Sequence, residues 1–204
     1  MEIKLLKPVG FTANCYTLTD GDSVAVIDPG IYYKEAAEII KQYKKGYILL
    51  THCHFDHILG LYKLWQETGA KVVISFADSV GLKEENDISL VKQTGNFMPT
   101  VTPDIIVNDG DKLPFFDDFI TVIHTPGHTE GSVCYKYKGA LFSGDTLFPE
   151  TIGRTDLPTG DFFTLLRSLE KLKDLPDDTV IYPGHENTTT IKHEKEFNPY
   201  MKRI

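Results

Sequence analysis

Residues 51–57, Thr-His-Cys-His-Phe-Asp-His, place four potential metal ligands within six positions. His52 and His54 are two residues apart, so in an extended chain both imidazoles project to the same side and can bind one cation. Asp56 and His57 come where the apolar spacing that follows predicts the start of a helix. A chain that turns there from strand to helix aims a carboxylate and a third imidazole beside the first ion. Buried without a cation, these groups would be poorly satisfied, so a metal site is favoured over a polar surface loop.

Three more ligand-type side chains follow apolar, strand-like runs in the same manner. Ile-Thr-Val-Ile leads through Thr-Pro-Gly to His128, Ala-Leu-Phe-Ser-Gly leads to Asp145, and Thr-Val-Ile-Tyr-Pro-Gly leads to His185. Loops at strand ends commonly carry the functional groups of layered α/β folds. We therefore expect these loops and residues 51–57 to meet at one edge of the fold.

Five histidines and two aspartates suit two metal ions, with Asp145 as the ligand that both ions share. Each ion then has three further ligands, which are His52, His54 and His128 for one ion and Asp56, His57 and His185 for the other. Two such ions would convert a shared water to hydroxide near neutral pH and polarise a carbonyl or phosphoryl oxygen. The centre would keep a net positive charge, which favours an anionic intermediate and an anionic leaving group.

The ligand types restrict the metal to a few candidates. Nitrogen and oxygen donors suit zinc, iron or manganese, and cellular availability can override intrinsic affinity. We expect two divalent ions, with zinc as the first candidate. Cys53 should point away from its neighbours and pack in the core, the alternative being a coordinating or redox role. His124 and His193 fit no ligand position and are interpreted as packed or exposed histidines.

The elements that must position these residues can be predicted from periodicity and from turn-forming residues. Asp28, which follows the second strand of a hairpin, either orients a metal-bound histidine or caps a turn. Residues 95–103 form an irregular loop that could cover a pocket. The remaining predictions are hairpin strands at 15–19 and 23–27, a helix at 34–45 stopped by Gly46, a helix from 57 to 69, a strand at 71–75, a helix at 76–85, a turn at 109–111, a strand at 119–123 and a helix from 161 that ends before 176.

Length and composition describe an ordinary globular chain. The 204 residues are 41% hydrophobic and show no linker, which predicts a single domain over 1–204. A net charge of −8 argues against a nucleic-acid or anionic-membrane partner. Three widely spaced cysteines give no disulfide framework, and no signal peptide or membrane span is evident, so the expected location is the cytoplasm.

With these residues in place, the chain resembles the metallo-β-lactamase superfamily, and within it the short glyoxalase II-like hydrolases. The resemblance runs along nearly the whole chain, through Asn-Cys-Tyr at 14–16, Val-Ile-Asp-Pro-Gly at 26–30, residues 51–57, Thr-Pro-Gly-His-Thr at 125–129, Ser-Gly-Asp-Thr-Leu-Phe at 143–148 and Tyr-Pro-Gly-His at 182–185. It implies an α/β fold, a four-layer αβ/βα sandwich with a dinuclear site at one edge of two sheets. Aspartate at 145 instead of cysteine, with His57, departs from the zinc β-lactamases that confer drug resistance.

Two further features bear on the resemblance. Gly153-Arg154-Thr155-Asp156 looks like a segment of glyoxalase II-like and persulfide dioxygenase members, in which Arg154 and Asp156 would brace the loop beside the metals; an exposed ion pair is the alternative. Only 19 residues follow His185, so we expect no C-terminal helical domain for glutathione. The thioesterase chemistry carries over, and the glutathione specificity does not.

The leading hypothesis is a metal-dependent hydrolase of small thioesters, such as an acyl-glutathione or another low-molecular-weight thiol ester. A hydroxide between the metals attacks the carbonyl, and Asp56 holds its metal and orients that hydroxide. The main alternative is a mononuclear-iron persulfide dioxygenase that uses His52, His128 and Asp145. Lactone or phosphodiester hydrolysis and a non-catalytic metal-binding module rank lower. The sequence leaves the oligomeric state open.

Overall fold

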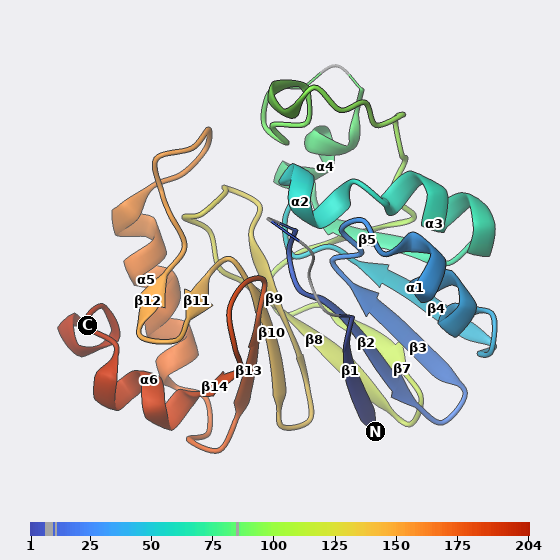
Figure 1. Cartoon of the computed structure of the whole chain (residues 1–204). Helices are drawn as coiled ribbons and strands as arrows, with labels where there is room; N and C mark the ends of the chain where they lie inside the picture. The colour runs from blue at the N-terminus through green and yellow to red at the C-terminus, as the bar shows by residue number, and fades with distance from the viewer. Residues whose placement is uncertain (7–9, 11, 85) are drawn as a thin grey trace.

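Two six-stranded sheets face each other in the computed structural model of the chain, which describes residues 1–6, 10, 12–84 and 86–204 (Figure 1). The first sheet has the order β1 (Glu2–Leu6), β2 (Cys15–Asp20), β3 (Ser23–Ile27), β4 (Lys45–Leu49), β5 (Lys71–Ser75) and β6 (Ile105–Val107). The second has the order β14 (Thr189–Thr190), β13 (Val180–Pro183), β10 (Ala140–Gly144), β9 (Val133–Tyr137), β8 (Asp118–His124) and β7 (Lys112–Phe115). A short ribbon of β11 (Leu147–Phe148) and β12 (Thr151–Ile152) stands beside the second sheet.

Three apolar clusters separate four layers. Side chains from both sheets, including Leu49 of β4 and Tyr135 of β9, fill the space between the sheets. On the outer face of the first sheet, Ile48 packs under α1 (Tyr33–Ile40) and α3 (Leu61–Thr68). The outer face of the second sheet packs against α5 (Phe162–Lys173) and α6 (Ile191–Phe197). Because the end of β4 is covered on both faces, its last three residues, Tyr47, Ile48 and Leu49, are all apolar or aromatic. The predicted αβ/βα sandwich is confirmed.

The first helix is shorter than the sequence predicts. It was expected to continue to residue 45, but α1 ends at Ile40 and residues 41–44 turn back toward the sheet. The amide groups of Lys44 and Lys45 donate to the Asp22 carbonyl at 3.1 and 3.3 Å. Lys45 already opens β4, in register with Ser23 of β3. Parallel pairing with β3 therefore ends the helix before Gly46, which lies inside the strand.

The helix after the ligand segment is broken in two. α2 (Phe55–Ile58) stops at Leu59, and α3 starts at Leu61 and ends against Gly69 in the left-handed conformation, as predicted. The Gly60 amide leaves the helical pattern to donate to the Gly30 carbonyl. A Cβ at position 60 would collide with that carbonyl, so this contact requires glycine.

Within 76–104, the described residues form only short helical turns, namely α4 (Phe76–Ser79), η1 (Val80–Leu82) and η2 (Lys92–Thr94). The predicted helix at 76–85 is therefore wrong beyond residue 82, and its last residue, Glu85, lies outside the described residues. Residues 95–103 are irregular, as predicted. Their buried side chains, Met98 and Val101, pack on the first sheet's outer cluster.

The hairpin, the strand at 71–75, the turn at 109–111 and the strand at 119–123 are confirmed by the structure. The helix predicted from residue 161 is α5, in which the Asp161 carboxylate caps the Thr164 amide at 2.7 Å. The short turn η3 (Met201–Arg203) follows α6. Among the described residues, no helix has the length and apolar character to cross a bilayer.

Candidate metal centre

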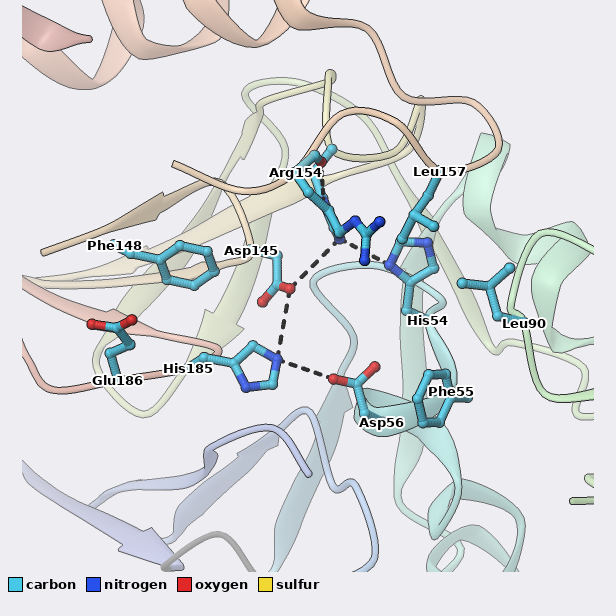
Figure 2. Close-up of a pocket in the computed structure, with 11 residues that line it drawn as sticks. His54, Phe55, Asp56, Leu90, Asp145, Phe148, Arg154, Leu157, His185 and Glu186 are labelled. Carbon is cyan, nitrogen blue, oxygen red and sulfur yellow. Dashed lines mark hydrogen bonds and ion pairs between the residues drawn. The ribbon is translucent and has the colours of Figure 1, made fainter. Parts of the chain in front are cut away.

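The loops that follow β4, β8, β10 and β13 meet at one edge of the two sheets, as the sequence predicts. All seven candidate ligands come together there, in three overlapping groups of three. Two are the expected triads, and the third joins His52 and His57 to Asp145, which also lies near His128 and His185. Figure 2 shows Asp56, Asp145 and His185 pointing toward one another at the floor of a pocket. The first sheet supplies residues 51–57 and the second supplies His128, Asp145 and His185, so each group draws on both halves of the molecule.

The first triad consists of His52, His54 and His128, whose ligand atoms lie within 4.8 Å of one another. All three side chains are buried, and Nδ1 of His54 is 2.8 Å from Nε2 of His128. Burial lowers the pKa of His52 well below its ordinary value and, together with the neighbouring imidazoles, lowers the pKa of His54 to about 3. These shifts favour the neutral imidazole of His52 and of His54, the form that binds a metal.

The second triad consists of Asp56, His57 and His185. Nε2 of His185 is 3.0 Å from Oδ2 of Asp56, and Nε2 of His57 is 3.7 Å from the same oxygen. Burial alone would lower the pKa values of both histidines, but the surrounding carboxylates, with Asp56 prominent, raise them above their ordinary value. This triad contains a carboxylate and is more open, since a third of the His185 side chain is exposed.

Asp145 lies between the triads. Its Oδ1 is 3.3 Å from Nε2 of His57, and its Oδ2 is 3.6 Å from Nε2 of His128 and 3.7 Å from Nε2 of His185. Burial opposes ionisation, but the imidazoles, His57 foremost, hold the pKa of Asp145 below its ordinary value. The carboxylate is therefore ionised and placed to face two cations at once.

The orphaned buried atoms of the cluster test whether these residues fit a metal. The buried atoms without a hydrogen-bond partner among the described residues include His52 Nε2, His54 Nε2, His57 Nε2 and Asp145 Oδ1. Buried polar atoms normally have partners, and four orphans of ligand type in one cluster are what a cation would satisfy. The donor set of imidazole nitrogens and carboxylate oxygens fits zinc, iron or manganese equally.

Asp28 holds His57 from behind. Its Oδ2 accepts a hydrogen bond from His57 Nδ1 at 2.9 Å, which fixes the proton on that nitrogen and leaves Nε2 free to bind a metal. The same carboxylate accepts from the Thr51 amide at 2.8 Å and from the Thr51 hydroxyl at 2.6 Å. Asp28 therefore contacts the histidine and Thr51 at the start of the ligand segment, and the hydrogen bonds of the described residues include none between its carboxylate and its own turn.

His128 is oriented by a backbone group. Its Nδ1 donates to the Arg154 carbonyl at 2.7 Å, so residue 154 braces the site through its main chain. The Arg154 guanidinium instead forms a two-pronged ion pair with Asp156, with both contacts at 2.7 Å and both side chains exposed. Asp156 itself touches none of the seven ligands in the contacts of the described residues, so its part is that of the exposed ion pair.

The cysteine and the two histidines that the sequence left out of the ligand set, Cys53, His124 and His193, lie outside the cluster, as expected. Cys53 is buried with its thiol against Gly81, and burial raises the pKa of that thiol. Nε2 of His124 is 3.0 Å from the Glu130 carbonyl, and Nε2 of His193 is 3.1 Å from the Glu150 carboxylate.

The cluster opens into a pocket of about 360 Å³. Beyond the ligands and Arg154, its walls contain residues that the sequence analysis did not identify, namely Phe55, Leu90, Phe148, Leu157 and Glu186. Phe55 and Glu186 directly follow His54 and His185, which was an available signal. Leu90 comes from segment 76–104, whose sequence shows no clear helix or strand period. It lines the pocket, whereas residues 95–103, which the sequence suggests as a cover for a pocket, are not among the lining residues.

Comparison with known proteins places this geometry in context. The sequence model of the metallo-beta-lactamase superfamily matches residues 8–185. The hydroxyacylglutathione hydrolase GloC of Haemophilus influenzae is 35% identical over 215 residues, covering 98% of both chains. The B3 metallo-beta-lactamase BLEG-1 superposes with a TM-score of 0.88 at 34% identity, over 98% of this chain and 99% of that one. TTHA1623 in a di-iron-bound form has a TM-score of 0.80 at 30% identity, over 98% and 100%.

Proposed function

The chain belongs to the metallo-beta-lactamase superfamily of metal-dependent hydrolases, and from this premise we propose that it hydrolyses small thioesters. The observation that carries the proposal is the pair of triads around Asp145 at the floor of a pocket. The likeness to GloC over the whole length of both chains supports a thioester among the possible substrates.

The chain's own residues divide the work of such a reaction. When bound, two divalent ions would supply Lewis acidity and lower the pKa of a water molecule. His52, His54 and His128 would hold one ion and Asp56, His57 and His185 the other, and Asp145 is the residue that both ions would share. Asp56 has one oxygen 3.0 Å from His185, and we assign its carboxylate a second task, accepting a hydrogen bond from the attacking water and so orienting it.

The pocket walls suggest the kind of substrate. Phe55, Leu90, Phe148 and Leu157 form apolar sides suited to a small acyl group. Arg154 is the cationic side chain among the lining residues, at the top of the view in Figure 2, and its guanidinium keeps donors that Asp156 does not use. We assign the anionic end of a thiol carrier to this side of the pocket. The net charge of −8 makes a nucleic acid an unsuitable partner.

The test is turnover by protein reconstituted separately with zinc, iron and manganese on a panel of acyl-thiol esters that includes lactoyl-glutathione. We expect thioester cleavage by at least one metal form, and we expect Asp56→Asn to lower kcat by about 100-fold or more, the range of a general base. Arg154→Gln should raise KM for anionic carriers and leave neutral thioesters unchanged. Fully metal-loaded protein that cleaves no member of the panel contradicts the proposal.

The likeness to BLEG-1 favours one second candidate, hydrolysis of a β-lactam amide. The same residues would bind and polarise either carbonyl, so the pocket walls must discriminate. A chromogenic cephalosporin tested beside the thioester panel separates the two candidates, because a β-lactamase should show the larger kcat/KM on the cephalosporin.

The di-iron form of TTHA1623 makes iron a specific candidate for the metal. Because the alternative function, a persulfide dioxygenase, requires iron, that alternative is tested on the same protein. A dioxygenase would consume oxygen in the presence of a glutathione persulfide with a single iron per chain. Oxygen-electrode measurements on the iron form, run beside the thioester assay, decide between a hydrolase and an oxygenase.

A further inference from the structure

Asp78 is a buried carboxylate behind the first triad, at the end of the α4 turn. Its place in the sequence indicates no role, and it is not among the residues that line the pocket of the metal centre. We propose that Asp78 is the positioning residue of the first triad, a role parallel to that of Asp28 in the second. The inference rests on the proposed metal centre and is independent of which substrate is cleaved.

Three hydrogen bonds from two separate ligand loops end on the Asp78 carboxylate. Oδ2 accepts from the Cys53 amide at 2.9 Å and from the Thr129 hydroxyl at 2.9 Å, and Oδ1 accepts from the Gly131 amide at 2.9 Å. All these groups are buried. Because an ionised carboxylate only accepts hydrogen bonds, all three donors are matched.

The groups that donate to Asp78 lie next to the three histidines of the first triad in the sequence. Cys53 lies between His52 and His54, so fixing its amide fixes the peptide from which both imidazoles diverge. Thr129 directly follows His128, and its hydroxyl is also 2.7 Å from that of Ser132. One carboxylate therefore sets the distance between the loop of the first sheet and the loop of the second that together make the triad.

The packing around Gly131 supports a built contact. A Cβ at position 131 would collide with Oδ1 of Asp78 and with the Ser75 hydroxyl, so the main chain can approach the carboxylate only where glycine stands. A Cβ at position 81 would likewise collide with the side chain of Cys53. Two glycines thus allow α4, the ligand segment and the loop after His128 to close on one another.

The structure shows two separate orienting devices. Asp28 touches a ligand side chain, whereas Asp78 touches only the main chain and a hydroxyl next to the ligands. Loss of Asp78 should therefore affect the geometry of the first triad and leave the second triad with its own carboxylate support.

The experiment measures zinc binding to metal-free Asp78→Asn by competition with a chromophoric chelator. The amide that replaces one oxygen presents hydrogens to the buried donors. We expect one of the two zinc dissociation constants to rise about 10- to 100-fold, as for other partners behind metal ligands, with the other unchanged. Gly131→Ala, which breaks the same contact from the opposite side, should weaken the same ion.

Background variants assign the weakened ion to a triad. His185→Ala should retain one zinc at the first triad, and adding Asp78→Asn should release it. His54→Ala should retain one zinc at the second triad, and adding Asp78→Asn should leave it bound. The reverse pattern would overturn the proposal.

Glu194→Gln is the matched control. Glu194 is also fully buried and accepts three hydrogen bonds, from the Glu150 amide at 2.8 Å, the Thr189 hydroxyl at 2.7 Å and the Asn198 amide group at 2.8 Å. Its loss should lower the free energy of unfolding without a selective effect on either zinc ion. If Asp78→Asn behaves like this control, with both zinc constants unchanged or equally weakened, Asp78 is only a structural residue. Because the readout is metal affinity, failure here differs from failure of the thioester assay.

Discussion

The two triads of the metal centre contain similar residues in opposite settings. The first is made of three buried imidazoles, and burial lowers the pKa values of His52 and His54. The second has a carboxylate, two histidines whose pKa values are raised by the surrounding carboxylates, and partial exposure to the pocket. The first site is therefore closed and made of imidazoles alone, whereas the second contains a carboxylate and is open.

The difference indicates how the sites would divide the binding of metal and substrate. A closed site would hold an ion rigidly, because Nε2 of His52 and Nε2 of His54 are buried and have no other partner among the described residues. An open site with a carboxylate attracts a cation by charge and still leaves coordination positions toward the pocket. We therefore expect exchange with solvent and contact with the leaving group mainly at the second triad.

Removing the residue common to both triads should have the largest effect. Asp145→Ala takes away the carboxylate that lies within 3.7 Å of ligand nitrogens of both triads. We expect less than one metal ion per chain after gel filtration in metal-free buffer, and hydrolysis at background level. Metal analysis that still finds two ions would show that the triads bind independently, and would remove Asp145 as a bridge.

Asp28→Asn should separate the triads. The change weakens the hydrogen bond that fixes the proton on His57 Nδ1. Affinity for the second ion should fall about 10- to 100-fold, while the first ion stays bound. Competition titrations with zinc measure both constants. Asp104→Asn is the control, because the Asp104 carboxylate accepts the Val72 amide at the start of β5 and contacts no candidate ligand among the described residues. An equal loss of both ions would contradict separate support.

Acid should distinguish the triads in metal-free protein. The folded pKa of His54 is lowered to about 3, so below the unfolded value near 6.5 the unfolded chain binds more protons and stability falls as pH falls toward 3. His185 has a raised pKa, so its contribution is present below about 6.5 and disappears as pH rises through the folded value. Urea denaturation at several pH values should show a smaller acid loss in His54→Gln and a larger one in His185→Gln. Identical pH profiles for the two variants would refute the contrast.

Cys53→Ala should have the smallest effect. The thiol packs against Gly81, away from the ligand atoms, so both ions should remain bound. Stability should fall by about 1 kcal/mol, similar to other losses of one buried heavy atom. Metal content and urea denaturation measure the two effects. Loss of an ion in this variant would make Cys53 part of the centre after all.

The ligands could be predicted from the sequence because each follows an apolar run that reads locally as a strand. The side chain of Asp28 could be predicted in the same way, since it ends the hairpin before the ligand segment. The nature of the ions, their number and the substrate stay predictions, because the same imidazoles and carboxylates serve several metals and several carbonyl compounds.

What the sequence did not predict depends on contacts between distant segments. The end of α1 is decided by the pairing of β4 with β3, which no helix propensity encodes. Leu90 and Asp78 lie in or beside short turns that show no helix or strand periodicity. Their roles depend on contacts with the second half of the chain, which supplies the other pocket walls and the Gly131 amide. Arg154 was identified for its charge, yet its carbonyl makes the contact with His128.

The division of each triad between the two sheets also sets an order of events during synthesis. More than half of the chain separates residues 51–57 from His185. As the polypeptide leaves the ribosome, the early histidines emerge without the partners that complete either site, and the His128 site can close before the His185 site. Neither triad can therefore be completed until residues of the second sheet have been synthesised and folded against the first.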